Sequence, residues 1–221
     1  MSDRKSREFK RRERDILDCT LKLLSGEQRE ILSVDKIAQH TGIGKGTVYK
    51  HFASKDDIYA RLLLDNYQSI LAEFKRIATD DTLTGVQQMR GMLLYAFQYH
   101  RDNVAHQHMH VHFIQRASRE RMSATYQQQL DYAEEQFIEA FGQAVYKGVV
   151  EGDVNPDMPR EAMMAGMNAT FEGAIVTLQE GGSFKQRQLE TAEQKSTYIN
   201  LVVDYMIAAL IQQPTDRKKD E

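Results

Sequence analysis

The scarcity of proline is the feature of this 221-residue sequence that most limits its fold. The chain holds 3 prolines, at positions 156, 159 and 214, so none precedes Pro156. Proline removes a backbone donor and breaks helices, so long stretches of this chain can be helical without interruption. Apolar residues recur at helical spacing throughout, and few segments alternate apolar and polar residues as strands do. The sequence therefore predicts an all-α protein of about nine helices.

The predicted helices begin and end at recognisable capping and breaking residues. Ser33 and Ser54 precede apolar periodic segments and are expected to act as N-caps. Gly26 and the Gly181-Gly182-Ser183 run are expected to end helices. The predicted helices cover residues 6–24, 34–40, 45–51, 55–77, from the polar break at 80–82 to 100, 103–120, 123–150, 160–180 and 192–212.

Charge is distributed unevenly along the chain, although the net charge is only -3. Residues 1–55 hold 13 Lys and Arg against 8 Asp and Glu, whereas the remainder is acidic. A basic N-terminal segment on an acidic body indicates a polyanionic partner at one end. We predict a nucleic-acid-binding domain over 1–55, a second domain over 56–212, and a disordered tail over 213–221.

The single cysteine, the lack of a long apolar run and the lack of a secretory signal all indicate the same compartment. One cysteine excludes an intrachain disulfide, and a membrane span needs roughly 20 apolar residues. We therefore expect a cytoplasmic protein without membrane contact.

The segment from Ser33 to Tyr59 has the pattern of a helix-turn-helix. Gly42 can adopt the positive φ of a sharp turn, and Ala38 is small enough for two helices to approach each other. Four apolar residues are expected to form a small core between the helices, namely Ile37, Ile43, Val48 and Phe52. The outward face of the third helix is then cationic and rich in hydrogen-bonding groups, comprising Lys45, Gly46, Thr47, Tyr49 and Lys50. Such a face suits the major groove of DNA.

This segment also resembles a known family. The run GIGKGTVYKHFASKDDIYARLL is similar to the signature of the tetracycline-repressor (TetR) family, and the resemblance covers roughly residues 10–65. The family usually has an aromatic residue after the glycine that ends the first helix, whereas Glu27 follows Gly26 in this chain.

The resemblance implies individual roles in DNA binding. Ser33 and Lys36 would contact phosphate. Lys45, Gly46 and Thr47 would lie at base edges. Tyr49, Lys50, His51 and Lys55 would hold the DNA backbone. The basic residues of the N-terminal run would either reach an adjacent groove or remain solvated, and these are Arg4, Lys5, Arg7, Lys10, Arg11 and Arg12.

Four histidines alternate along the segment 103–114, at positions 106, 108, 110 and 112. On a helix they form two i, i+4 pairs on opposite sides, and one such pair has the spacing of two metal ligands. Three readings stay open: metal or pH sensing, polar anchoring of an organic ligand, and an ordinary structural role. We predict no metal site and no cofactor.

Methionine and aromatic residues are frequent in the C-terminal region, and such residues often line pockets for apolar ligands. We therefore predict a small, mostly apolar effector. The predicted ligand-binding residues are Met92, Tyr95, Tyr99, His108, Met109, His112, Phe137, Met167 and Phe171.

Small residues recur at helical spacing over 160–180, and the segment 192–212 is apolar nearly all round. Both features favour close helix packing, and with the family resemblance they predict a homodimer built from these two helices. The predicted interface residues are Ala162, Ala165, Gly166, Ala169, Gly173, Ala174, Tyr198, Val202, Tyr205 and Met206.

The sequence thus predicts a transcriptional repressor that a small-molecule effector releases from palindromic double-stranded operator DNA. The alternative is a metal- or pH-responsive regulator that senses through His106–His112. We expect no enzymatic activity, because the chain contains no G-x-S-x-G, H-E-x-x-H, phosphate-loop or paired-carboxylate signature.

Overall fold

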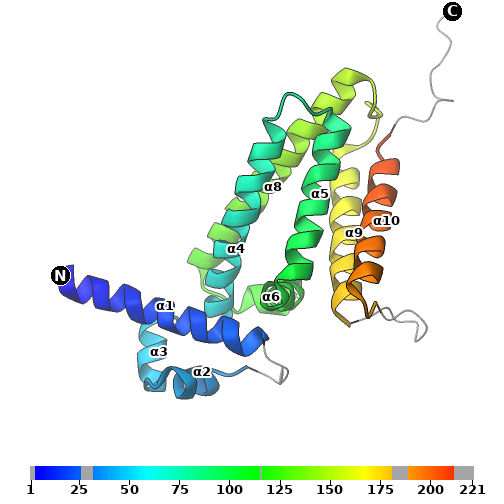
Figure 1. Cartoon of the computed structure of the whole chain (residues 1–221). Helices are drawn as coiled ribbons and strands as arrows, with labels where there is room; N and C mark the ends of the chain where they lie inside the picture. Colours follow the sequence, from blue (N-terminus) through cyan, green and yellow to red (C-terminus); the bar gives the residue numbers. More distant parts are fainter. Residues whose placement is uncertain (1–2, 26–31, 115, 181–188, 212–221) are drawn as a thin grey trace, which may run out of the picture. The chain divides into compact units, whose positions relative to one another are not determined.

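The chain is helical throughout the part that the computed structural model describes, which comprises residues 3–25, 32–114, 116–180 and 189–211 (Figure 1). The predicted all-α class is confirmed. The helices of these ranges are α1 (Asp3–Ser25), α2 (Val34–Thr41), α3 (Lys45–His51), α4 (Lys55–Ala78), α5 (Gly85–Asp102), α6 (Val104–Ile114), α7 (Arg116–Glu120), α8 (Ala124–Glu151), α9 (Arg160–Glu180) and α10 (Ala192–Ala208).

Two helix assignments differ from the sequence prediction. The helix expected over 103–120 is assigned as α6 and α7, on either side of residue 115, which lies outside the described residues. The last helix ends at Ala208 rather than at residue 212. The chain turns after it so that Ile211 forms an antiparallel bridge with Val154, and the Asn155 N–H donates to the Leu210 carbonyl at 3.1 Å. The predicted breaks at 26 and 181–183 and the tail over 213–221 lie outside the described residues.

Packing divides the chain into two compact units. The first comprises residues 1–66 and 103–131, and the second comprises residues 67–102 and 132–221. Helices α4 and α8 each contribute residues to both units. These units describe packing rather than function, so the predicted functional boundary after residue 55 stays a prediction.

The first unit is built around α1, which packs against α2 and α6. Its core contains side chains that are at most 2% exposed, namely Ile16, Ile37, Val48, Phe52 and Ile58. Both predicted serine caps are present, because Ser33 Oγ accepts from the Lys36 N–H at 3.2 Å and Ser54 Oγ accepts from the Asp57 N–H at 3.0 Å. Each cap satisfies a backbone donor that the first turn of a helix leaves without a partner.

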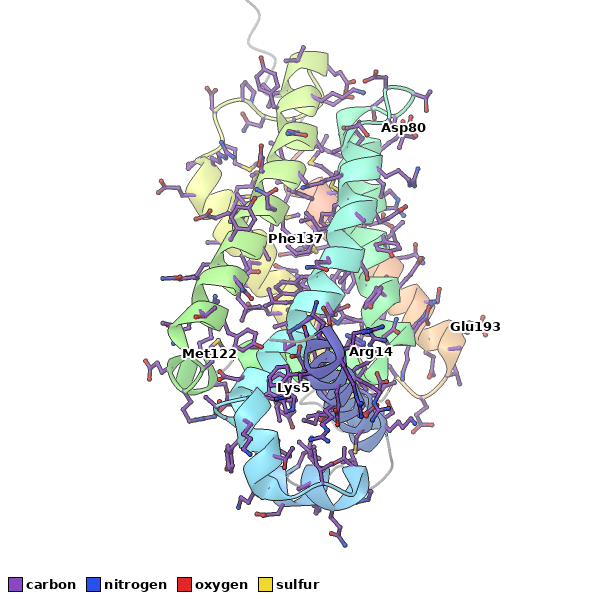
Figure 2. All side chains as sticks on the ribbon, turned by 90° about the vertical axis from the view of Figure 1, so that its left-hand side faces the viewer. Lys5, Arg14, Asp80, Met122, Phe137 and Glu193 are labelled. Carbon is purple, nitrogen blue, oxygen red and sulfur yellow. The ribbon has the colours of Figure 1, made fainter. Side chains whose placement is uncertain are left out.

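The second unit has α5 packed against α9 and α10. Buried side chains of all three helices form its core, including Met89, Met92, Phe97, Ile175 and Val203. On the α8 side, the ring of Phe137 meets Tyr67 and Phe74 edge-on, at centroid distances of 5.3 Å and 5.2 Å (Figure 2).

Candidate functional site

The turn between α2 and α3 is the local structure that aims the third helix. Gly42 has φ 68 and ψ 21, the left-handed conformation that the sequence pattern requires. Its N–H donates to the Gln39 carbonyl, and the Ile43 N–H donates to the Ala38 carbonyl at 3.1 Å. A side chain at position 42 would be strained in this conformation, because only glycine adopts positive φ without steric cost. The turn thus ends α2 sharply and redirects the chain into α3.

Helix α3 has one buried side chain and an otherwise open surface. Val48 is 1% exposed and holds the helix against the core. Lys45, Gly46, Tyr49 and Lys50 are exposed, and Thr47 is half-buried. A Cβ added to Gly46 would meet no atom within 4 Å, so packing inside the chain does not require glycine there.

Lys45 is held at the N-terminal end of this surface by Asp35 of α2. The Lys45 Nζ atom lies 2.8 Å from Asp35 Oδ2, and this hydrogen bond raises the pKa of the lysine. Both side chains are largely in solvent, where an ion pair contributes little to stability. A phosphate can therefore replace Asp35 as the partner of Lys45 at little cost in free energy.

The other predicted DNA contacts surround α3 in different environments. Lys36 is exposed on α2, and the Ser33 hydroxyl, although it caps α2, still carries a proton to donate. The ammonium of Lys55 lies 5.6 Å from the centre of the Tyr59 ring. His51 is packed against Phe9 of α1, with ring centroids 4.0 Å apart and its Nδ1 atom buried. Burial lowers the pKa of His51, and its role at the DNA backbone stays a prediction.

The first turn of α4 is tied to the turn between α7 and α8. Asp56 is 5% exposed and accepts from Arg121 Nε at 3.0 Å. Asp57 is 2% exposed, and its carboxylate accepts from the Ser123 N–H at 2.7 Å. This hydrogen bond caps the start of α8. The sequence pattern indicated only that these carboxylates suit the helix dipole. Their partners lie about 65 residues further along the chain, so local spacing carries no signal for them.

The predicted ligand-binding residues fall in both units. In the second unit, Phe171 of α9 stacks on Phe97 with centroids 4.6 Å apart, and Met92 and Met167 are buried. Tyr95 and Tyr99 neighbour each other on α5, with centroids 6.2 Å apart. Phe137 lies against α4, as described above. His108 and Met109 belong to α6 of the first unit, and the side chain of His112 lies outside the described part.

His100 is a buried polar residue that the ligand prediction did not include. It is 2% exposed at the end of α5, and its ring lies 5.8 Å from that of Phe171. The signal was present in the sequence, because His100 continues the apolar face formed by Met89, Leu93 and Phe97. A histidine on a buried face can anchor a polar group of a ligand.

The alternating histidines lie along α6, as the spacing predicts. Burial lowers the pKa of His106 and lowers that of His110 to about 4. Within the described residues, no three His, Cys, Asp or Glu side chains lie close enough together to hold a metal ion. The metal-sensing alternative therefore finds no support in the described part of the chain.

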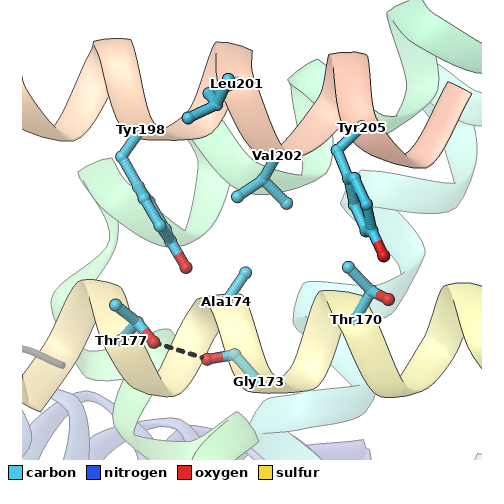
Figure 3. Close-up of a pocket in the computed structure, with 8 residues that line it drawn as sticks. All are labelled: Thr170, Gly173, Ala174, Thr177, Tyr198, Leu201, Val202 and Tyr205. Carbon is cyan, nitrogen blue, oxygen red and sulfur yellow. Dashed lines mark hydrogen bonds between the residues drawn. The ribbon is translucent and has the colours of Figure 1, made fainter. Parts of the chain in front are cut away.

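The predicted dimer residues form an open face on α9 and α10. Ala162, Ala165, Gly166, Ala169 and Gly173 are exposed, and Tyr205 is 68% exposed. A groove of about 470 Å³ lies between the two helices, with Tyr198 and Tyr205 directed from α10 toward α9 (Figure 3). Its lining consists of Thr170, Gly173, Ala174, Thr177, Tyr198, Leu201, Val202 and Tyr205. Ala174 and Met206, in contrast, are only 4% and 2% exposed, so both are buried within the chain, although Ala174 also lines the groove.

None of the helices among the described residues has the length and apolar character that a membrane span needs.

Comparison with known proteins first concerns the N-terminal region. Residues 16–62 match the model of a family described as bacterial regulatory proteins, tetR family. A helix-turn-helix-type transcriptional regulator of Staphylococcus aureus (strain bovine RF122 / ET3-1) is 33% identical over 88 residues, which cover 40% of this chain and 47% of the relative. The chain thus spans about half the length of the curated relatives that it matches.

Solved structures extend the similarity of fold to most of the chain. The transcriptional regulator FadR from Bacillus subtilis, crystallised with stearoyl-CoA, has a TM-score of 0.64 and 13% identity, covering 89% of this chain and 98% of that one. The ketosteroid transcriptional regulator KstR2 of Mycobacterium tuberculosis has a TM-score of 0.64 and 18% identity, covering 91% and 96%. The helix-turn-helix region over residues 16–62 thus matches the tetR family of bacterial regulatory proteins, and the rest of the chain shares the fold of these solved regulators.

Proposed function

We propose that this protein is a cytoplasmic transcriptional repressor, not an enzyme, that binds operator DNA as a homodimer and is released by a small, mostly apolar effector. The observation that carries the proposal is the surface of α3. A seven-residue helix is held by one buried side chain, follows a left-handed glycine, and leaves its cationic and hydrogen-bonding residues open. This is the arrangement that a recognition helix needs to enter a major groove.

The open surface divides into base-reading and phosphate-binding residues. Gly46 offers no side chain, which allows close approach of the duplex, and Thr47 can donate to or accept from a base edge. Lys45 lies beside them at the base edges, and Tyr49 and Lys50 supply contacts to the phosphate backbone around this point. Phosphate contacts set register and affinity, whereas base contacts set sequence preference.

A second copy of the chain is proposed to pack on the α9 and α10 face. Apolar side chains stand exposed there, including Leu201 at 67% and Tyr205 at 68%. A two-fold dimer would present two α3 helices to half-sites about 34–36 Å apart, or a multiple of that distance. The operator should then be nearly palindromic.

The effector is proposed to bind among the Met and aromatic side chains of α5 and α9 in the second unit. That FadR was crystallised with stearoyl-CoA supports an apolar effector only by analogy of fold. Helix α4 connects the two units over 24 residues, about 36 Å at 1.5 Å per residue. An effector that favours one direction of this helix alters the spacing of the two α3 helices and releases one half-site, with a coupling of roughly 1–3 kcal/mol.

The test begins with operator selection from a random duplex library, using the full-length protein. A near-palindromic consensus and a symmetric footprint that weakens steeply with salt are expected. An asymmetric, salt-independent footprint would contradict the proposal. Stearoyl-CoA is the first effector probe, and calorimetry with and without saturating operator then measures coupling. A probe that releases DNA must bind the operator complex more weakly by the same factor, because coupling is reciprocal.

A further inference from the structure

The N-terminal half of α1 is a strongly cationic helical segment that the proposed function does not use. It precedes residue 16, where the family match begins. Residues 4–12 and 14 are exposed. We call residues 4–14 the basic arm, and its cations are Arg4, Lys5, Arg7, Lys10, Arg11, Arg12 and Arg14.

The charges of the basic arm are arranged unfavourably for an isolated helix. Its two carboxylates are already engaged, Glu8 with Arg12 at 2.6 Å and Glu13 with Arg61 of α4 at 3.8 Å. Five cations make no ion pair among the side chains that the structure describes, and these are Arg4, Lys5, Lys10, Arg11 and Arg14. Like charges three or four residues apart repel, and cations near a helix N-terminus oppose its dipole. A local arrangement that disfavours the fold is typical of a functional surface.

Contacts hold the basic arm in a fixed position beside the recognition helix. Phe9 stacks on His51, the last residue of α3, with ring centroids 4.0 Å apart. Residues 4–9 then extend about 8 Å beyond this contact at 1.5 Å per residue. The N-terminal end of α1 projects past α3 in the same unit (Figure 1). Lys5 and Arg14 lie on opposite sides of the helix (Figure 2), so cations surround the arm.

We propose that the basic arm binds the phosphate backbone of the DNA that flanks the half-site read by α3. The inference rests on the proposed DNA-binding function and adds a second contact surface to it. A duplex carries a phosphate about every 3.4 Å along each strand, so a helical arm with cations on several sides meets phosphates in any nearby orientation. An anionic membrane is a poorer partner, because an interfacial helix needs an apolar face. Phe9, the one large apolar side chain of the arm, is stacked on His51.

The test compares two matched double variants on selected operator DNA. Lys5→Gln/Lys10→Gln removes two charges from the basic arm. Lys75→Gln/Lys195→Gln removes the same two charges from α4 and α10, and therefore controls for net charge. Each protein is titrated, at several salt concentrations, with a duplex trimmed to the two half-sites and with one that carries about one helical turn more on each side, roughly 10 base pairs.

On the longer duplex, the arm variant should bind on the order of a hundredfold more weakly near 0.15 M salt, and its log–log salt slope should be shallower by about 3.6, because a dimer loses two phosphate contacts from each of its two arms. It should gain less affinity from the added flanks than the wild type, whereas the control variant should gain as much as the wild type. The inference is wrong if the arm variant has the same salt slope and the same dependence on the flanking DNA as the wild type. It is also wrong if the arm variant and the control variant lose the same affinity for DNA. If the wild type binds no duplex at all, the proposed DNA-binding function itself fails. If the wild type binds and the arm variant binds identically, only the inference about the basic arm fails. Circular dichroism checks that both variants remain folded.

Discussion

Replacing Gly173 by alanine distinguishes a dimer interface from an ordinary solvent-facing helix surface by the sign of its effect. Gly173 lies in the interior of α9, lines the α9–α10 groove and is exposed. A Cβ built at this position meets no atom within 4 Å of the same chain. Alanine is favoured over glycine by about 1 kcal/mol in a helix interior, so the substitution should stabilise a single chain by that amount.

If a second copy packs on this face, the same substitution should weaken dimerisation even though it stabilises the single chain. Each added methyl group would enter a close helix contact, and overpacking typically costs about 1–3 kcal/mol per site. Two-fold symmetry introduces the methyl group twice, so dimerisation should weaken by at least about 2 kcal/mol, or roughly 30-fold in Kd.

Sedimentation equilibrium measures the dimer Kd, and urea unfolding at several protein concentrations measures stability. The control is Gly91→Ala in α5, where the added Cβ would lie 3.6 Å from Ile77 Cγ2 of the same chain, an ordinary contact. It should raise stability and leave the Kd unchanged. If Gly173→Ala behaves like Gly91→Ala in both measurements, α9 does not pack against a second copy through this face.

Three further predictions concern the DNA surface, the core and pH. Thr47→Ala should change the consensus selected from random DNA by about 1 kcal/mol at one position of each half-site, whereas Lys50→Ala should weaken all sequences alike and reduce the salt slope by about one per chain, or about two for the dimer; the reverse pattern would show that the α3 face is wrongly assigned. Gly85→Ala should destabilise the fold by about 3 kcal/mol or more in urea unfolding, because its Cβ would lie 2.2 Å from a backbone nitrogen of α8; unchanged stability contradicts this. Burial lowers the pKa of His110 to about 4. Below about pH 6.5 the unfolded chain therefore binds a proton at His110 that the folded chain does not bind. The free energy of unfolding should fall by up to about 1.4 kcal/mol per pH unit from pH 6.5 toward pH 4. His110→Gln should flatten this part of the stability curve, and an equally steep curve in that variant would locate the proton uptake elsewhere.

Local pattern was sufficient to predict most helices and the helix-turn-helix. Gly42, the Ser33 and Ser54 caps and the buried set of Ile37, Val48 and Phe52 all depend on neighbours within a few residues. Such relations repeat at the period of the helix, so spacing alone reveals them. Met206 was misplaced because α10 is apolar nearly all round and its inner and outer faces look alike in sequence.

Contacts between distant segments could not be predicted in this way, and they determine how the first turn of α4 is held. Asp56 and Asp57 lie in the first turn of α4, the helix after α3, and spacing indicates only that carboxylates suit a first turn. In the folded chain both are buried, and their partners are Arg121 and the Ser123 N–H at the start of α8. Helix α4 is therefore fixed at its first turn by α8 as well as by its own cap. Because α4 and α8 both continue into the second unit, a change there has two covalent routes to the residues beside α3. A hinge confined to α4 would leave the carboxylate contacts of Asp56 and Asp57 intact. A shift of α8 would either break these contacts or move the first turn of α4 together with α8.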